Sequence, residues 1–223
     1  MSSGNFKHDL FAQFAVVGKA LGHGNRLELL EFLAQRERSV EELASLAGLS
    51  VANTSRHLQQ LRQAGLTLNR KVGLKVFYRI SGDDVIELLN ALRAVAARHV
   101  ADVDRLVNSY LTVKDNLEPI SRVELLERVR HDLVTVIDVR PSEEYAAGHI
   151  PSATNIPLSK LEKHLSKLDP EQEIVAYCRG PHCVLAFDAV AKLREKGFKA
   201  RRLHDGYPEW KLAGLPVESE QQE

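Results

Sequence analysis

Two helix-start signals and two glycines define a pair of short helices in the first third of the chain. Ser39, followed three residues later by Glu42, is a capping box, and it predicts a helix that ends at Gly48. Ser50 is placed to cap a second helix, which we expect to end at Gly65. Because the link between them is so short, the two helices are predicted to form a helix-turn-helix.

The periodicity of this pair separates an apolar face from a polar one. We predict that the inward side chains are Leu43, Leu46, Val51, Leu58 and Leu61. The outward face of the second helix is predicted to present Ser50 at its start, then Asn53, Thr54, Ser55, Arg56, His57, Gln59 and Gln60. Such side chains reach base edges and phosphates, whereas a helix that is only solvated more often carries Glu and Lys. The second helix is therefore predicted to read DNA.

The segments on either side extend this pattern. Residues 7–34 are predicted to be helical with a break at residues 22–25. After the break, Asn25 is expected to cap a helix whose apolar face is Leu27, Leu29, Leu30, Phe32 and Leu33. Residues 66–81 alternate apolar and polar residues on both sides of Val72-Gly73, which predicts a β-hairpin with a basic tip. Beside a DNA-reading helix, such a hairpin is a wing that can lie along the DNA backbone.

Positive charge gathers in this part of a chain whose net charge is zero. Residues 50–80 contain no acid but hold Arg56, Arg62, Arg70, Lys71, Lys75 and Arg79. A charge run is often only a solvated surface. Its overlap with the helix and the hairpin favours a phosphate-binding surface instead, and we assign Arg70, Lys71 and Lys75 to phosphate contacts.

Across roughly residues 8–110 the sequence resembles the ArsR family of winged-helix repressors. The stretches LGHGNRLELLEFLAQRERSVEELASLAGLSVANTSRHLQQLRQAGL and NRKVGLKVFYRIS carry the resemblance. It implies a double-stranded DNA operator as partner and a homodimer paired through the first helix and the helix after the wing. We expect that later helix to cover residues 83–111, with an apolar stripe of Val85, Leu88, Leu89, Leu92, Val95, Ala96 and Val103.

The sequence departs from this family at its usual metal site. Many members sense metals through cysteines in the helix before the recognition helix, but the corresponding segment here, VEELASLAG, has none. The later helix offers only His99 with Asp102 and Asp104 nearby, which is more typical of an exposed surface than of a metal site. We therefore expect no metal input to this half.

A different pattern follows a polar segment that contains Pro119. The predicted elements are a helix over residues 120–132, the strand LVTVIDVRP, a helix at 160–168, the strand IVAYC, a helix to about residue 196 and a strand near 199–203. Alternating strands and helices predict an α/β domain with a parallel sheet. We place an all-α winged helix-turn-helix domain with a β-hairpin wing at residues 1–112, a linker at 113–118 and the α/β domain at 119–223.

Both cysteines of the chain, Cys178 and Cys183, lie in one loop after the strand IVAYC. In a reducing compartment such a pair argues against a structural disulfide and for a reactive or ligating role. We expect Cys178 to lie beyond the carboxyl end of its strand, at the start of a helix. Backbone N–H groups there, with the positive charge of Arg179, stabilise a thiolate and lower its pKa from about 8.5. Such a thiolate can attack a sulfane sulfur and hold it as a persulfide.

Across roughly residues 119–218 this half is similar to the rhodanese domain. The match is carried by DVRPSEEYAAGHIPSATNIP, by IVAYC with the Arg-Gly that follows it, and by DGYPEWKLAGLPV. The resemblance implies that Cys178 accepts sulfur and that Asp138 and Arg140 support the site from the preceding strand end. Without the resemblance, Asp138 is interpreted as a strand-end residue that binds backbone amides, and Arg140 as its surface neighbour.

The resemblance also implies that the loop surrounds Cys178 with Arg179, Gly180, His182 and Cys183. Cys183 stands where the rhodanese pattern usually has a basic or hydroxyl residue. It is therefore either a resolving thiol that forms a disulfide or shares sulfur with Cys178, or a small packed apolar side chain. His182 is either exposed to solvent or helps to hold the thiolate or a substrate anion.

Other uses of the cysteines fit less well. A phosphatase on this fold needs an arginine six residues after the cysteine, and that residue is Val184. A zinc site needs four ligands, and the loop offers only two thiols and a histidine. A thiol pair that binds a soft ion such as arsenite stays open.

The sequence as a whole predicts a cytoplasmic protein that needs no cofactor or resident metal. No apolar run approaches the roughly 18 residues that span a membrane, and the N-terminus lacks the features of a secretory signal. The leading hypothesis is a DNA-binding transcriptional regulator whose rhodanese domain carries or senses reactive sulfur from a small donor anion. One alternative is a sulfurtransferase, using thiosulfate or polysulfide, with a fused autoregulatory DNA-binding domain. Another is an arsenic or redox sensor that uses the cysteine pair.

Overall fold

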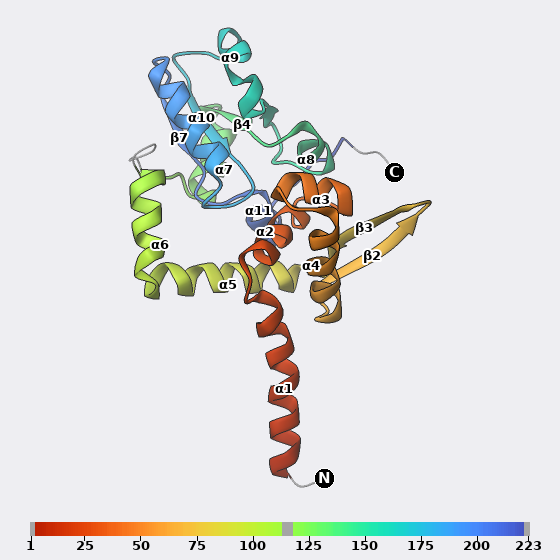
Figure 1. Ribbon diagram of the computed structural model, residues 1–223. Helices are drawn as coiled ribbons and strands as arrows, with labels where there is room; N and C mark the ends of the chain where they lie inside the picture. Colours follow the sequence, from red (N-terminus) through yellow and green to blue (C-terminus); the bar gives the residue numbers. More distant parts are fainter. Residues whose placement is uncertain (1–2, 113–117, 221–223) are drawn as a thin grey trace. The chain divides into compact units, whose positions relative to one another are not determined.

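The computed structural model describes residues 3–112 and 118–220, and these fall into two compact units (Figure 1). The first unit extends to Leu89 and the second begins at Asn90. The predicted linker at residues 113–118 lies almost wholly outside the described residues, so the predicted domain boundaries stay a prediction. Among the described residues, none of the helices is both long enough and apolar enough to cross a membrane.

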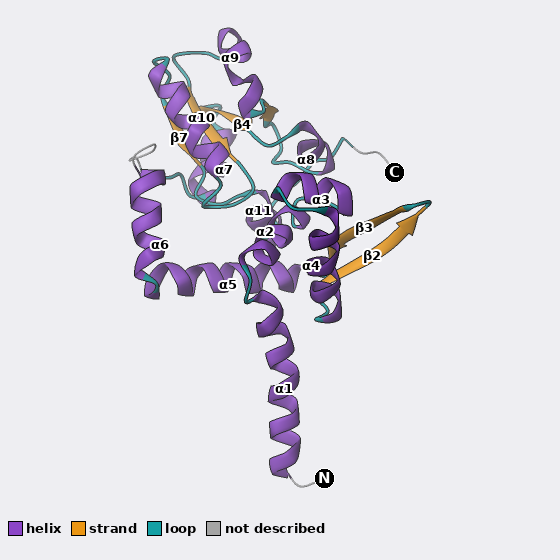
Figure 2. Cartoon of the chain, viewed as in Figure 1, coloured by secondary structure: helices purple, strands orange, loops and turns teal. Residues whose placement is uncertain are grey.

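The first unit is mainly helical and carries one small sheet (Figure 2). Its elements are α1 (Ser3–Leu21), α2 (Gly24–Leu33), β1 (Arg38–Ser39), α3 (Val40–Ala47), α4 (Val51–Gln63), β2 (Thr67–Val72), β3 (Lys75–Ile80) and the beginning of α5 (Asp83–His99). Its core is built from side chains of α2, α3 and α4, and the fully buried ones are Leu29, Leu30, Leu43, Leu58 and Leu61.

The predicted helix-turn-helix is confirmed. The hydroxyl of Ser39 accepts from the backbone N–H of Glu42, whose carboxylate accepts in return from the N–H of Ser39. Gly48 ends α3 with φ at +63°, a left-handed conformation that glycine adopts without strain. Ser50 caps α4 by accepting from the N–H of Asn53. Local capping chemistry therefore sets both helix starts.

Three details of this region differ from the prediction. The N-cap of α2 is His23, whose ring accepts from the N–H of Asn25, so Asn25 is not the cap. Leu46 and Val51, which were predicted to point inward, are both exposed. These two apolar positions lie at the edges of their helices' apolar faces, where a periodic pattern alone does not determine burial.

The predicted hairpin is confirmed, and it has one more strand than expected. β2 and β3 pair in antiparallel register from Thr67 opposite Ile80 to Val72 opposite Lys75. The chain turns at Gly73, where φ is +58°. The two-residue strand β1 joins on the other side of β3, which gives the order β1-β3-β2. Because β1 is so short, it carries no periodic signal that the sequence could show.

The long helix predicted over residues 83–111 is broken. α5 ends at His99, and Val100 has extended backbone angles of φ −109° and ψ 100°. The chain continues as α6 (Ala101–Leu106) and a π-helical turn (Val107–Thr112). Of the predicted apolar stripe, Val85 and Leu89 are buried, whereas Leu88, Leu92 and Val95 are exposed.

The second unit contains the predicted parallel sheet. Its strands are β4 (Val134–Asp138), β5 (Thr154–Asn155), β6 (Glu173–Tyr177) and β7 (Ala200–Arg202), and all pair in parallel in the order β5-β4-β6-β7. Besides the rest of α5 and α6, its helices are α7 (Arg122–Arg130), α8 (Ser142–Ala147), α9 (Leu161–His164), α10 (Val184–Glu195) and α11 (Tyr207–Leu212). The helix predicted at residues 160–168 is divided, with α9 flanked by short 3₁₀ turns.

Both faces of this sheet are covered, because alternate strand residues enter two separate apolar clusters. Ile174 and Ala176 of β6 pack in the cluster that includes α10, whereas Val175 and Tyr177 pack in the cluster that includes α7 and α11. Strands that are buried on both faces have continuous apolar sequences, which is why IVAYC predicted a buried strand. The carboxyl ends of β4 and β6 then lie side by side, with Asp138 opposite Tyr177.

Candidate functional site

The outward face of α4 carries part of the predicted DNA-reading set. Ser50, Asn53, Arg56, Gln59 and Gln60 are exposed, and Ser55 is partly exposed. Exposed side chains of these types can hydrogen-bond to bases and phosphates, although Gln60 Oε1 already accepts from Arg26 Nη1 at 2.6 Å. The structure thus presents a short polar surface on one helix, of the kind that fits a DNA groove.

Two residues of that set face the protein interior. Thr54 is 0% exposed, and its hydroxyl donates to the carbonyl of Ser50 at 3.0 Å. His57 is 5% exposed, and its ring centroid lies 4.6 Å from that of His23. The prediction that Thr54 and His57 point outward was therefore wrong. Residue type suggested a polar face, but the helical period places these two positions beside Leu58 and Leu61, on the packed side.

Burial also changes the chemistry of His57. Burial lowers its pKa, and the nearby positive charges of His23, Arg26 and Arg56 lower it further. His57 is therefore a neutral interior residue that positions α4 against the start of α2, and its Nδ1 has no hydrogen-bond partner within the described part of the chain.

The predicted phosphate-binding residues of the wing are all exposed, and one of them is already paired. Arg70, Lys71 and Lys75 lie on β2 and β3 with their side chains in solvent. The Nε atom of Arg70 lies 2.8 and 2.9 Å from the two carboxylate oxygens of Glu37, and its guanidinium lies 5.3 Å from the ring centroid of Phe77. DNA phosphate would have to compete with Glu37 for Arg70. This pairing was not predicted, because Glu37 lies outside the basic segment of residues 50–80.

The cysteine loop begins directly at the end of β6. Cys178 follows Tyr177, the last residue of β6, and Cys183 is the N-cap of α10. The prediction that Cys178 itself lies at the start of a helix was therefore wrong, because Cys183 occupies that position. Between them, the N–H of Cys183 donates to the carbonyl of Gly180 at 3.1 Å, which closes a tight turn.

The two cysteines are joined by a disulfide bond, and their Cα atoms are 6.2 Å apart. Cys178 is 1% exposed and Cys183 is 9% exposed, and both pack in the apolar cluster beneath α10. The sequence argued against a structural disulfide. The bond closes a loop of very few residues, so it constrains the unfolded chain far less than a long-range bond would. The arrangement is the one that a resolving thiol requires, and Cys183 is also packed as a small apolar side chain.

Arg179 does not stand free beside the sulfur atoms. Its Nε lies 3.0 Å from each carboxylate oxygen of Glu144, and its Nη2 lies 2.7 Å from Oε1. The Glu144 side chain is completely buried on α8. The expectation that Arg179 adds a positive charge to a thiolate therefore needs correction, because a buried carboxylate compensates that charge. The contact of Glu144 with Arg179 was not predicted, because the two residues are 35 positions apart in the chain.

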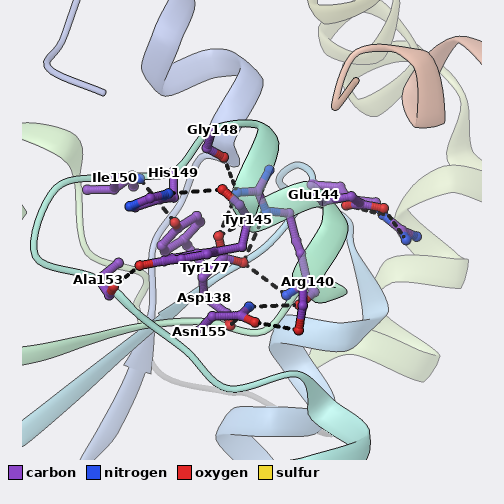
Figure 3. Close-up of polar contacts among 12 residues, drawn as sticks. Asp138, Arg140, Glu144, Tyr145, Gly148, His149, Ile150, Ala153, Asn155 and Tyr177 are labelled. Atoms are coloured by element: carbon purple, nitrogen blue, oxygen red, sulfur yellow. Dashed lines mark hydrogen bonds and ion pairs between the residues drawn. The ribbon is translucent and has the colours of Figure 1, made fainter. Parts of the chain in front are cut away.

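Asp138 and Arg140 form a buried ion pair at the end of β4 (Figure 3). The Arg140 Nη2 lies 2.6 Å from Asp138 Oδ2, and it also donates to the carbonyl of Gly148 at 2.8 Å. Asp138 accepts from the backbone N–H of Arg140 at 2.9 Å, as expected for a strand-end carboxylate. The interpretation of Arg140 as a surface neighbour was wrong, since its side chain is 0% exposed.

This ion pair reaches the cysteine loop through two tyrosines. Burial and the charge of Asp138 raise the pKa of Tyr177 well above its usual value, so its hydroxyl stays protonated. That hydroxyl also accepts from the N–H of Ile150 at 3.1 Å (Figure 3). The guanidinium of Arg140 lies 4.5 Å from the ring centroid of Tyr207, and the N–H of Tyr207 donates to the carbonyl of Cys178 at 3.0 Å.

Gly206, just before α11, allows the start of α11 to lie close against the cysteine loop. A Cβ atom at this position would lie 2.3 Å from backbone atoms of both Arg179 and Gly180. Glycine is therefore required where α11 meets the loop. This glycine belongs to the motif DGYPEW, which carries part of the resemblance to the rhodanese domain. The motif alone does not show that Gly206 contacts the backbone of Arg179 and Gly180. Gly180 is partly buried and His182 is exposed.

The described residues hold no group of three or more His, Cys, Asp or Glu side chains placed to bind a metal ion. The loop itself presents the two cysteines, framed by the Asp138–Arg140 and Glu144–Arg179 ion pairs and by the backbone of α11.

Comparison with known proteins assigns both regions. The family model "Bacterial regulatory protein, arsR family" matches residues 23–67, and "Rhodanese-like domain" matches residues 121–213. The HTH-type transcriptional regulator Rv0324 of Mycobacterium tuberculosis is 46% identical over 212 residues, which cover 95% of this chain and 93% of that protein. The chain belongs to the ArsR family of transcriptional regulators and carries a C-terminal rhodanese domain.

Two further relatives each match one part of the regulator. The thiosulfate sulfurtransferase GlpE of Coxiella burnetii is 31% identical over 93 residues, which cover 41% of this chain and 85% of that protein. The solution structure of the homodimeric winged helix-turn-helix DNA-binding domain Mb0332 from Mycobacterium bovis, a possible ArsR-family regulator, is 41% identical and covers 45% of this chain and 91% of that one, with a TM-score of 0.41.

Proposed function

We propose that this regulator controls transcription in response to reactive sulfur, which it takes up at Cys178. The observation that carries the proposal is the placement of both cysteines in one buried loop at the carboxyl end of β6. Residues 1–112 contain no cysteine, so a thiol signal has to enter through this loop. The relation to a thiosulfate sulfurtransferase supports sulfur as the signal.

The chemistry needs only the two thiols and a sulfane donor. The Cys178 thiolate attacks the outer sulfur of a hydropersulfide RSSH, so that a Cys178 persulfide forms and RS⁻ leaves. The Cys183 thiolate then attacks Sγ of Cys178, and the bond to the added sulfur breaks with release of HS⁻. The product is the Cys178–Cys183 disulfide that the structure contains. Reaction with the sulfur donor therefore changes the loop from its dithiol form to its disulfide form.

The DNA-binding half is proposed to act as a homodimer in the cytoplasm. Its first helix exposes Phe6, Leu10, Phe11, Phe14 and Val16. Exposed aromatic and aliphatic side chains along one helix mark an interaction surface, and α5 adds exposed Leu88, Leu92 and Val95. The homodimeric relative supports the same assembly. A dimer places two copies of α4 for the two half-sites of an operator.

The test compares operator binding by the reduced full-length chain before and after treatment with a hydropersulfide. We expect affinity to change by roughly 5- to 150-fold, the usual range of coupling between two sites. Cys178→Ser should bind DNA normally and lose the response. Cys183→Ser should still accept sulfur but stop at the persulfide, which mass spectrometry detects. A full response in Cys178→Ser would exclude the proposal.

A second candidate, a sulfurtransferase with an autoregulatory DNA-binding half, is favoured by the relation to GlpE. It predicts repeated turnover of thiosulfate or polysulfide with a thiol acceptor, and DNA binding that is independent of sulfur. A response to arsenite and not to hydropersulfide, lost in Cys183→Ser, would instead indicate the arsenic or redox sensor.

A further inference from the structure

The cysteine loop contains one permanent positive charge, and a carboxylate already pairs with it. Residues 178–183 are Cys-Arg-Gly-Pro-His-Cys, so Arg179 is the one arginine or lysine among them. Its guanidinium binds the carboxylate of Glu144 through three contacts of 2.7 to 3.0 Å. Glu144 is 0% exposed and Arg179 is 12% exposed, so solvent screens this pair weakly.

Pairing with Glu144 compensates the charge of Arg179 and also determines where its guanidinium points. A guanidinium that binds one carboxylate through two nitrogen atoms is held in a planar fork, and its donors point at that carboxylate. Glu144 in turn is held on α8, directly after the Asp138–Arg140 pair at the end of β4. Turning Arg179 toward a ligand at Cys178 would leave a buried carboxylate without its partner, which is costly.

We propose that Glu144 determines the specificity of this site, restricting Cys178 to neutral or singly charged sulfane donors such as organic hydropersulfides and disfavouring the dianion thiosulfate. The inference rests on the proposed function and names the class of its donor. A thiolate and a dianion repel each other, and an uncompensated arginine would offset that repulsion. With Arg179 neutralised by Glu144, the repulsion stays. A neutral hydropersulfide meets none.

The two donors differ in what leaves as well as in charge. With thiosulfate, the Cys178 thiolate attacks the outer sulfur, the bond to the sulfonate sulfur breaks, and sulfite leaves with the electron pair. With a hydropersulfide, the thiolate attacks the terminal sulfur, the sulfur–sulfur bond breaks, and RS⁻ leaves while the proton stays on the transferred sulfur. Both steps give a persulfide on Cys178, so one product can be measured for both donors.

The experiment measures the second-order rate of persulfide formation on Cys178 in the reduced full-length chain, by intact mass spectrometry. Thiosulfate and cysteine hydropersulfide are the donors, and Cys183→Ser is the common background so that the persulfide persists. Glu144→Gln keeps the size of the side chain and one hydrogen-bond acceptor for Arg179. Glu143→Gln, an exposed acid next to it on α8, is the matched control.

We expect the native site to react faster with the hydropersulfide. Glu144→Gln should raise the thiosulfate rate about tenfold and the hydropersulfide rate at most about twofold, and Glu143→Gln should change neither. The ratio of the two rates is decisive, because a change in the Cys178 thiol pKa alone would alter both rates equally. An unchanged ratio in Glu144→Gln, or equal native rates for both donors, would overturn the inference.

A second measurement covers the case in which Glu144→Gln does not fold. With Glu144 in place, added salt should accelerate the reaction with thiosulfate, because screening weakens repulsion between like charges. It should leave the reaction with hydropersulfide nearly unchanged. A thiosulfate rate that falls with salt would show a net positive site and exclude the inference. Loading by neither donor would defeat the proposed function as well, whereas loading without preference would defeat only this inference.

Discussion

The surface of α4 with the wing and the surroundings of the cysteine loop use charged side chains in opposite ways. On the wing, the side chain of Arg70 is 60% exposed and its partner Glu37 can be replaced by another anion. Around the loop, Arg140 is 0% exposed and its partner Asp138 cannot be exchanged. Charge in the first region is available to a ligand, whereas charge in the second region holds backbone in place. The same residue type therefore has different consequences in the two regions.

The largest expected effect comes from removing one partner of the buried pair. Arg140→Met should destabilise the second unit by about 3–5 kcal/mol, because Asp138 would remain buried without its counter-charge. Trp210 is the single tryptophan of the chain, lies in this unit and is 1% exposed. Urea unfolding followed by its fluorescence therefore reports on the second unit.

The matched control is the same substitution on the wing. Arg70→Met should leave the urea midpoint of Trp210 unchanged, and it should reduce the salt dependence of operator binding by about one phosphate contact. Glu37→Gln should act in the opposite direction and strengthen binding, because it frees Arg70. The contrast between the regions would be refuted by an Arg140→Met variant as stable as the native chain.

The same contrast explains which features could be predicted from the sequence. The capping box at Ser39, the turn at Gly73 and the apolar strand before Cys178 each depend on residues close together in the chain, and the structure confirms them. Thr54 and His57 have polar side chains, which predicted that they point outward, but the helical period places both on the packed side of α4. Local sequence signals therefore predicted the helices and strands well, but they predicted less well whether a single side chain is buried or exposed.

The support of the cysteine loop could not be predicted for a different reason. Glu144 meets Arg179 across 35 residues, and Tyr207 meets Cys178 from the far end of the unit. Such contacts depend on how β4, β6 and α11 come together, which no single stretch encodes. The motif around Glu144 indicated a fold, but it did not show that the carboxylate would neutralise the loop.

A smaller effect should follow from closing the space that Gly206 leaves. Gly206→Ala would place a Cβ 2.3 Å from backbone atoms of Arg179 and Gly180, so the loop must shift. We expect a loss of about 1–3 kcal/mol, as for other overpacked sites, and a changed rate of Cys178 alkylation in the reduced chain. Gly180→Ala is the control, since its Cβ would meet nothing closer than 3.8 Å. Equal effects of the two variants would show that the contact with α11 does not position the loop.

The smallest expected effect concerns pH, and it should appear in the first unit alone. Burial, followed by His23, Arg26 and Arg56, lowers the pKa of His57 in the folded chain below its ordinary value of about 6.5. Between these two pKa values the unfolded chain binds more protons than the folded chain, so acid favours unfolding. The contribution of His57 is complete above about pH 6.5 and is lost as the pH falls toward its folded pKa, with a slope of at most about 1.4 kcal/mol per pH unit.

Amide hydrogen exchange in α4, corrected for intrinsic rates and compared between pH 7.5 and 5.5, measures this loss. His57→Gln removes the titrating group, so its α4 should lose less protection on acidification than native α4. The fluorescence of Trp210 should follow the same pH profile in both chains, because His57 belongs to the other unit. An identical pH response of α4 in native chain and variant would assign the acid sensitivity to carboxylates. In that case the buried histidine would position α4 by packing alone.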